Sequence, residues 1–141
     1  MNKIDFHFQS RVFTIPNKRK LKEHIKYIFN TEEKEKELEH LNIIFCSDKF
    51  LLKMNRRYLH HDFYTDVIAF DLSENSQDII GEIYISVDRV NENARSLSLP
   101  FINELHRIIY HGILHLCGYT DADQKGKILM GKKENLYLRI F

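Results

Sequence analysis

Residues 101–121 read FINELHRIIYHGILHLCGYTD, and this stretch carries the strongest structural signal in the chain. Its apolar residues recur at the spacing of a helix with one buried face. They are Ile102, Leu105, Ile108, Ile109 and Leu116, with further apolar residues between them. Pro100 favours a helix start and Gly118 is a typical helix stop. We therefore predict one long helix here, packed against the core of the protein.

Outward from this helix, strand and helix patterns are intermixed along the chain. Residues Ile4 to Phe8 alternate apolar and polar side chains, as a half-buried strand does, and Ser47 is placed to cap a helix from Asp48. The predicted strands are 4–8, 41–46, 67–72 and 79–87, and the other predicted helices are 16–30, 48–59, 88–97 and 121–138, with the charged stretch 31–40 linking or extending the first helix. This mixture predicts an α+β fold, a small mixed sheet of about four strands covered by helices. No repeat or flexible linker interrupts it, so residues 1–141 are predicted to form a single domain.

The composition favours a soluble globular protein and argues against several other classes. The 141 residues are 43% hydrophobic, and 21 Lys and Arg oppose 20 Asp and Glu for a net charge of +1. Near-neutral charge argues against a domain that coats nucleic acid by bulk electrostatics. Residues 1–60 do hold 13 basic against 8 acidic side chains, which is typical of solvated helix faces but leaves open a basic groove for RNA phosphates. Two cysteines, no signal-peptide pattern and no long apolar run favour a cytoplasmic protein over secretion or membrane insertion.

Two histidines on the long predicted helix, His111 and His115, have the spacing of metal ligands. Four residues along a helix rotate the second imidazole only about 40° from the first, so both leave from one face. The pair alone is weak evidence for a metal site, because eight histidines in 141 residues often produce this spacing by chance. The residues that follow His115 strengthen the evidence, since Gly118 can turn the chain back and let Asp121 reach the ion as a third ligand. Three protein ligands with a fourth position for water are typical of catalytic zinc sites, and Asp123 is the rival third ligand.

The same pattern parallels the HExxHxxGxxH helix of one group of zinc peptidases, which makes the predicted metal helix zincin-like. Those peptidases place a glutamate general base directly after the first histidine. This chain has Gly112 there, which offers no proton acceptor. A metallopeptidase is therefore a minor alternative, and no separate general base is identifiable.

The segment HGILHLCGY, residues 111–119, resembles the HGxLHLxGY core of the YbeY family, the bacterial metal-dependent endoribonucleases of rRNA maturation. The resemblance continues upstream in the same order and spacing, over residues 55–121. Asn55, Tyr58, Asp62 and TDVIAF at 65–70 resemble the family's N-x-x-Y…D-x-x-T-D-V-L-S-F segment, GEIYIS at 81–86 resembles its G-D-I-x-I-S strand, and Glu104–Leu105 falls at the family's usual distance before the metal helix. Residues 1–54 add only a compatible layout.

The resemblance implies a zinc-dependent endoribonuclease that cleaves single-stranded RNA in small-subunit rRNA maturation and ribosome quality control. It implies one zinc ion held by His111, His115 and Asp121, with a bound water as the catalytic group. The implied partners are single-stranded RNA, ribosomal RNA and the ribosome, without DNA or membrane, and Tyr and Phe side chains are available to stack on bases. Two alternatives stay open: a non-catalytic ribosome-associated protein with a structural metal, and a small metallopeptidase.

Two positions depart from the family pattern. The family's third ligand is usually the histidine of a G-Y-D-H ending, and Asp121 stands at that place. A carboxylate also binds zinc, but its charge should make the bound water ionise less readily, and its harder oxygen widens the choice of metal toward manganese. Leu59 stands where the family usually has an arginine that would be expected to contact phosphate. Arg56 and Arg57 are nearby, although on a helix they point elsewhere than Leu59.

Other chemistry-bearing side chains are expected to have structural roles. Cys117 lies about 200° around the helix from the second metal histidine and is predicted to be a small buried apolar residue. His60 and His61 are predicted to lie in a surface turn, and His106 to bond a backbone group or solvent. Asp66 precedes a strand, where local turn hydrogen bonding is favoured over the orientation of a metal histidine.

Overall fold

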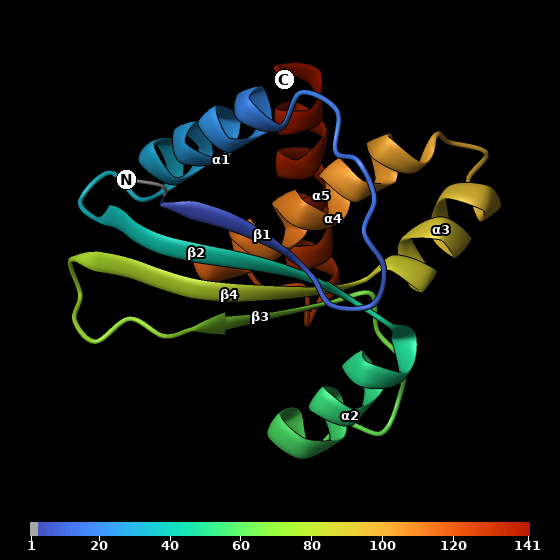
Figure 1. Cartoon of the computed structure of the whole chain (residues 1–141). Helices are drawn as coiled ribbons and strands as arrows, with labels where there is room; N and C mark the ends of the chain where they lie inside the picture. The colour runs from blue at the N-terminus through green and yellow to red at the C-terminus, as the bar shows by residue number, and fades with distance from the viewer. Residues whose placement is uncertain (1–2) are drawn as a thin grey trace.

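The computed structural model describes residues 3–141 and contains, within them, one four-stranded sheet and five helices (Figure 1). The strand order is β1-β2-β4-β3, in which β1 (Ile4–Phe8), β2 (Glu37–Cys46) and β4 (Asp78–Ser86) are parallel and β3 (Val67–Asp71) is antiparallel to β4. The helices are α1 (Lys18–Glu32), α2 (Asp48–Leu59), α3 (Val87–Ser96), α4 (Phe101–Leu116) and α5 (Gln124–Arg139). The predicted α+β fold with a small mixed sheet is therefore confirmed.

No helix among residues 3–141 has the length and apolar character that a membrane crossing requires.

The two faces of the sheet are buried by different helices, because successive side chains of a strand point to opposite faces. Ile83 and Ile85 of β4 belong to the main core together with apolar residues of α1 and α4. Tyr84, between them, packs on the opposite face near Leu51 of α2 and Ile68 of β3. Figure 1 shows α1 and α4 on one face of the sheet and α2 near the end of the other. Helix α5 packs against α4.

Helix α4 lies close to β4 at the position where it carries its histidines. A Cβ atom added to Gly112 would lie 2.8 Å from Cγ2 of Ile83, so only glycine allows this approach of helix and sheet. Position 112 therefore points toward the sheet and away from the imidazole of His111. A larger residue there would have to push α4 away from the sheet, which gives a packing reason for glycine at this position.

The structure moves some of the predicted element boundaries. Helix α2 has the predicted bounds, and Ser47 Oγ accepts a hydrogen bond from the Phe50 amide at 3.2 Å, which is the predicted cap. Helix α1 begins at Lys18 rather than Pro16, because Asn17 before it has a left-handed backbone with φ of 53°. Strand β2 begins at Glu37, so the second half of the charged stretch 31–40 is strand and not a linker.

Candidate metal centre

Three side chains from the end of α4 and the loop after it meet at one point. His111 Nε2 and His115 Nε2 are 3.0 Å apart, Asp121 Oδ2 lies 3.2 Å from His111 Nε2, and Asp121 Oδ1 lies 3.7 Å from His115 Nε2. Among residues 3–141 this is the one group of three or more His, Cys, Asp or Glu side chains with atoms close enough to share a metal ion. The structure thus brings together the three residues selected from the sequence, while their binding of a metal stays a prediction.

Gly118 makes this meeting possible by ending α4 with a reversal of the chain. Its φ of 95° is in the left-handed region that favours glycine. The Gly118 amide donates to the His115 carbonyl and the Tyr119 amide donates to the Leu114 carbonyl, both at 3.0 Å. These two bonds are the pattern of a Schellman motif, which satisfies the last carbonyls of the helix and folds the next residues back over its end. Asp121 is thereby returned to the histidine face.

Each imidazole is oriented by a hydrogen bond from its other nitrogen. His111 Nδ1 donates to Glu134 Oε2 at 2.7 Å, and His115 Nδ1 donates to the Tyr119 carbonyl oxygen at 3.0 Å. With both protons on Nδ1, both Nε2 atoms present lone pairs to the common point beside Asp121. Metal-ligating histidines are held in this way by a carboxylate or a carbonyl. Sequence reasoning missed Glu134, because it is 23 residues from His111 and lies on a different helix.

The surroundings shift the pKa values of the two imidazoles in opposite directions. Burial by itself lowers the pKa of His111, but the hydrogen bond and charge of Glu134, together with Asp121 and Asp66, raise it overall. Burial and the neighbouring His111 lower the pKa of His115. Two nitrogen lone pairs 3.0 Å apart beside a carboxylate repel one another unless a proton or a metal cation lies between them. Two imidazoles and one carboxylate are a recognised donor set for zinc.

Buried polar groups connect the metal centre to the rest of α4. Arg107 lies 3.4 Å from Glu134 Oε1 and 3.7 Å from Glu104 Oε1, so its single positive charge is shared between two buried carboxylates. Burial raises the pKa of Glu104. Asn93 of α3 donates to Glu104 at 3.4 Å and to Asp66 at 3.3 Å. Asp66 therefore bonds to a distant helix rather than within its own turn.

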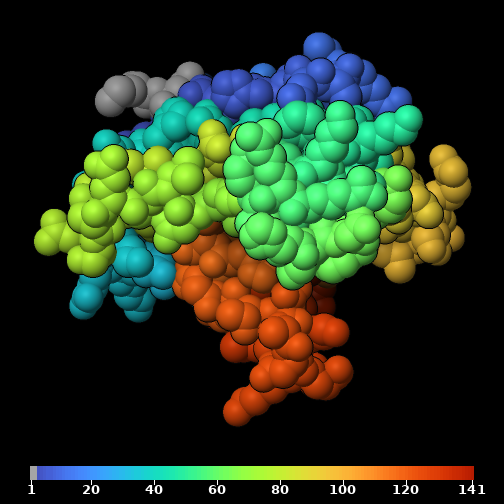
Figure 2. Space-filling view, turned by 90° about the horizontal axis from the view of Figure 1, so that it is seen from below, coloured from blue at the N-terminus to red at the C-terminus, as the bar shows by residue number. Residues whose placement is uncertain are grey.

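A cavity of about 500 Å³ opens beside the three clustered side chains, with His115 and Asp121 in its wall. The opposite wall comes from α2 and the loop that follows it, including Leu59, His61 and Phe63. Figure 2 views this face of the molecule, where the green surface of α2 and its following loop lies beside the orange surface of α4 and its following loop. None of the described residues that line this cavity is a lysine or an arginine.

The arginines next to Leu59 are engaged elsewhere. Arg56 forms an ion pair with Asp62, and the Arg57 guanidinium lies 5.5 Å from the centre of the Tyr58 ring. Leu59 itself lines the cavity, where it offers only an apolar surface. Neither arginine lines this cavity, so the structure gives no sign that they replace the expected phosphate contact.

Asp123, the rival third ligand, lies outside the cluster of His111, His115 and Asp121. Asp123 caps α5, with its Oδ1 accepting from the Gly126 amide at 2.7 Å. This cap also moves the start of the last helix from the predicted residue 121 to Gln124.

Cys117 is only partly buried and packs against the core, and burial raises its pKa to about 12. His60 and His61 are exposed, as predicted, although His61 also lines the cavity.

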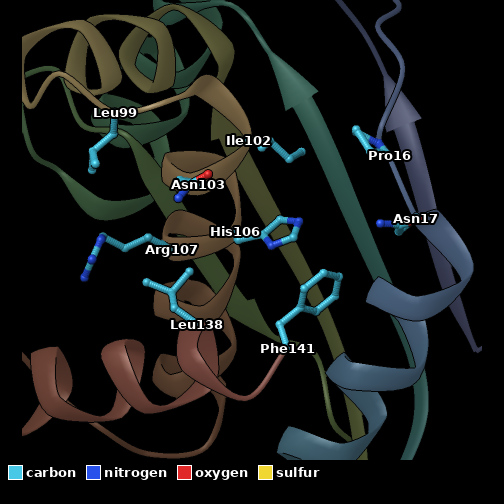
Figure 3. Close-up of a pocket in the computed structure, with 9 residues that line it drawn as sticks. All are labelled: Pro16, Asn17, Leu99, Ile102, Asn103, His106, Arg107, Leu138 and Phe141. Atoms are coloured by element: carbon cyan, nitrogen blue, oxygen red, sulfur yellow. The ribbon is translucent and has the colours of Figure 1, made fainter.

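The expectation for His106 is wrong. The residue is 8% exposed, its Nδ1 lies 3.5 Å from the Tyr110 hydroxyl, and its Nε2 is buried without a hydrogen-bond partner. It lies beside a separate cavity of about 360 Å³, where Figure 3 shows its ring between α4 and the start of α1 and close to Phe141. Since Nε2 is closed off from solvent, this cavity offers a ligand no accessible polar anchor at His106.

Comparison with known proteins places the chain among a group of similar sequences. A family model described as endoribonuclease YbeY matches residues 5–141. Proteins named endoribonuclease YbeY are similar at 48% identity in Flavobacterium psychrophilum, over 72% of this chain and 71% of that protein, and at 37% identity in Flavobacterium johnsoniae, over 98% and 96%. A Thermotoga maritima protein with a known solution structure is similar at 31% identity, with a TM-score of 0.63 over 95% of this chain and 87% of that one.

Proposed function

Because the chain belongs to the YbeY family of endoribonucleases, we propose that it hydrolyses single-stranded RNA with a zinc ion held by His111, His115 and Asp121. The observation that carries this proposal is the convergence of the two imidazole nitrogens and one carboxylate within 3.0 to 3.7 Å, with both Nδ1 atoms already donating to other groups. A zinc ion bound there would supply Lewis acidity for a phosphoryl oxygen and would lower the pKa of a coordinated water.

The protein's own residues position this chemistry. Glu134 and the Tyr119 carbonyl hold the two imidazoles in the tautomer that a cation requires. Gly112 provides no proton acceptor and faces the sheet, which disfavours a peptidase mechanism that relies on a glutamate at that position. The cavity beside Asp121 gives a single strand access to the site from the side of α2.

The proposal extends to substrate and location. Ribosomal RNA is the substrate class that the family resemblance implies, with small-subunit rRNA maturation and ribosome quality control in the cytoplasm as the setting. Residues 1–141 act in this proposal as one metal-dependent hydrolase domain. The support is the family match over residues 5–141 and the names of the two Flavobacterium relatives, which describe an endoribonuclease.

The test uses an end-labelled single-stranded RNA and an unstructured protein substrate, each with zinc, with manganese and with excess chelator. We expect internal cleavage of the RNA, loss of cleavage with chelator, recovery on zinc addition, and an intact protein substrate. The same RNA annealed to its complement serves as the duplex control and is expected to resist cleavage. His115→Ala should lose the cleavage while its circular dichroism spectrum stays that of the wild type.

The alternatives predict different results. Chelator-sensitive cutting of the protein substrate would replace the proposal with a peptidase. An RNA that stays uncut under every metal would overturn the endoribonuclease proposal. In that case, loss of ribosome association in His115→Ala would favour a binding protein with a structural metal.

A further inference from the structure

Two aromatic rings stand in the wall of the metal cavity on the side away from α4. His61 and Phe63 are stacked with ring centres 5.1 Å apart and an angle of 20° between their planes. Both rings line the cavity that also contains His115 and Asp121. Phe63 is 56% exposed, so the rest of the protein does not cover this residue.

The loop that carries these rings is fixed in place by α2. The buried Asn55 donates through Nδ2 to the Phe63 carbonyl at 2.9 Å, and its own carbonyl accepts from the His61 amide at 3.0 Å. Asp62, which lies between His61 and Phe63 in the sequence, forms an ion pair with Arg56 of α2. The loop that carries the aromatic pair is therefore bound to α2 by three contacts, which reduces the backbone freedom that would be lost when a ligand binds.

The charge of the cavity indicates how this wall would hold a polyanion. RNA is usually held by phosphate contacts from lysine or arginine, and none of the described lining residues of this cavity is of either type. Arg56 is paired with Asp62, and Leu59 is apolar. Aromatic stacking does not need a cation, because every base has a π face. Stacking is thus the interaction that this wall can offer to a nucleotide.

We infer that His61 and Phe63 form a stacking platform, which holds an unpaired base next to the phosphodiester that is cleaved at the metal centre. This inference rests on the proposed function and names the part of the substrate that the cavity holds. It requires single-stranded RNA, since a base must leave its duplex partner to stack on the platform. Phe63 and His61 are positioning residues here, because they contact the base and not the reacting phosphate.

The first experiment introduces a fluorophore into the platform. The chain contains no tryptophan, so Phe63→Trp provides a single indole whose fluorescence reports stacking. We expect saturable quenching by single-stranded oligoadenylate, recorded in the first seconds after mixing, in zinc-loaded and in chelated protein. An abasic ribose-phosphate oligomer of the same length should quench little. The control is Val12→Trp, at a residue 82% exposed that does not line the cavity, and its fluorescence should not change.

The second experiment separates binding from chemistry in the cleavage reaction. Phe63→Leu should raise KM for single-stranded RNA by about fivefold to 150-fold, the range of one lost base stack, and leave kcat within about twofold. Phe63→Tyr should restore KM. Tyr64→Leu is the matched control, because Tyr64 is also exposed but lies under the Arg89 guanidinium and does not line the cavity.

The results distinguish a failure of this inference from a failure of the proposed function. Cleavage of RNA by the wild type without quenching of Phe63→Trp, or with unchanged KM in Phe63→Leu, would overturn the platform and leave the nuclease standing. Quenching by oligoadenylate without any cleavage would keep the platform and overturn the proposed function. Equal quenching by the abasic oligomer would show that the wall holds phosphate and not bases, and would also overturn the platform.

Discussion

At the scale of single residues, Asp121 would set the charge of the proposed metal centre. It lies between two imidazoles, 3.2 and 3.7 Å from their Nε2 atoms. With this ligand a bound Zn²⁺ would carry a net charge of about +1 rather than the +2 of three neutral imidazoles. A lower charge weakens the pull on phosphate and on the proton of water, so a histidine at this position should give a more acidic water.

Substitution of Asp121 tests its place as third ligand. Asp121→Ala should weaken zinc binding by more than the tenfold to 100-fold loss typical of an outer hydrogen-bond partner, whereas Asp121→His should retain binding because an imidazole also donates to zinc. Competition with a chromophoric chelator measures both affinities. Asp123→Ala is the control, since Asp123 caps α5 and should cost only about 1 kcal/mol of stability. Retention of zinc by Asp121→Ala together with its loss in Asp123→Ala would move the third ligand to Asp123.

Glu134 would act on a bound metal through His111. Glu134→Gln keeps the size of the side chain but removes the charge that holds the Nδ1 proton of His111 at 2.7 Å. We expect zinc affinity to fall by about tenfold to 100-fold. The control is Glu92→Gln, at an exposed carboxylate of α3. An unchanged zinc affinity in Glu134→Gln would mean that His111 does not need this partner.

At the scale of elements, the C-terminus of α4 builds the site through one backbone conformation. Gly118→Ala should destabilise the protein by about 1 to 2 kcal/mol, because an L-residue is strained at the φ of 95° found there. It should also weaken zinc binding, since Asp121 depends on this turn. Gly131→Ala is the matched control within α5, where no atom lies within 4 Å of the added Cβ, and it should stabilise by about 0.5 to 1 kcal/mol. Urea unfolding measures both changes, and equal effects of the two substitutions would contradict the account.

The elements that sequence reasoning located well are those with a local signal at their ends. Ser47 caps α2 and Gly118 ends the helical pattern that carries the histidines, so both sites could be read from neighbouring residues. The first half of β2 lacks such a signal, because its exposed glutamates hide the alternation with the buried Leu38. Its strand character comes from pairing with β4 at Ile79, a contact that depends on distant residues.

At the scale of the whole molecule, the same distinction separates the predicted part of the site from the missed part. His111, His115 and Asp121 lie within eleven residues, so helix geometry and one turn bring them together. Glu134 reaches His111 only because α5 packs against α4. The rings of His61 and Phe63 enter the cavity only because the loop after α2 faces α4 across it. Contacts of this kind between distant elements cannot be predicted from the residues next to them in the sequence.

The buried His106, in the first half of α4, predicts a pH dependence of stability that does not involve the metal site. Burial, with the charges of His24 and Lys20, lowers the pKa of His106 to about 4 from 6.5. Below pH 6.5 His106 is protonated in the unfolded chain but stays neutral in the folded protein, so the free energy of unfolding falls. Above this pH His106 is neutral in both states and has no effect on stability. Between pH 7 and pH 5 the loss is about 2 kcal/mol.

The variant His106→Phe keeps an aromatic ring beside Phe141 and removes the titration. Urea unfolding in the presence of chelator should show a fall in stability from pH 7 to pH 5 that is about 2 kcal/mol smaller in the variant than in the wild type. An identical fall in both proteins would mean that His106 titrates normally in the folded state.

The central claim, that two imidazoles and a carboxylate at the end of α4 hold a divalent cation, has one direct measurement. The protein and its His115→Ala variant are dialysed against zinc, freed of unbound metal, and analysed for zinc per chain. The account predicts one zinc per wild-type chain and none above background in the folded variant. Equal zinc in both proteins, or none in the wild type, would contradict it.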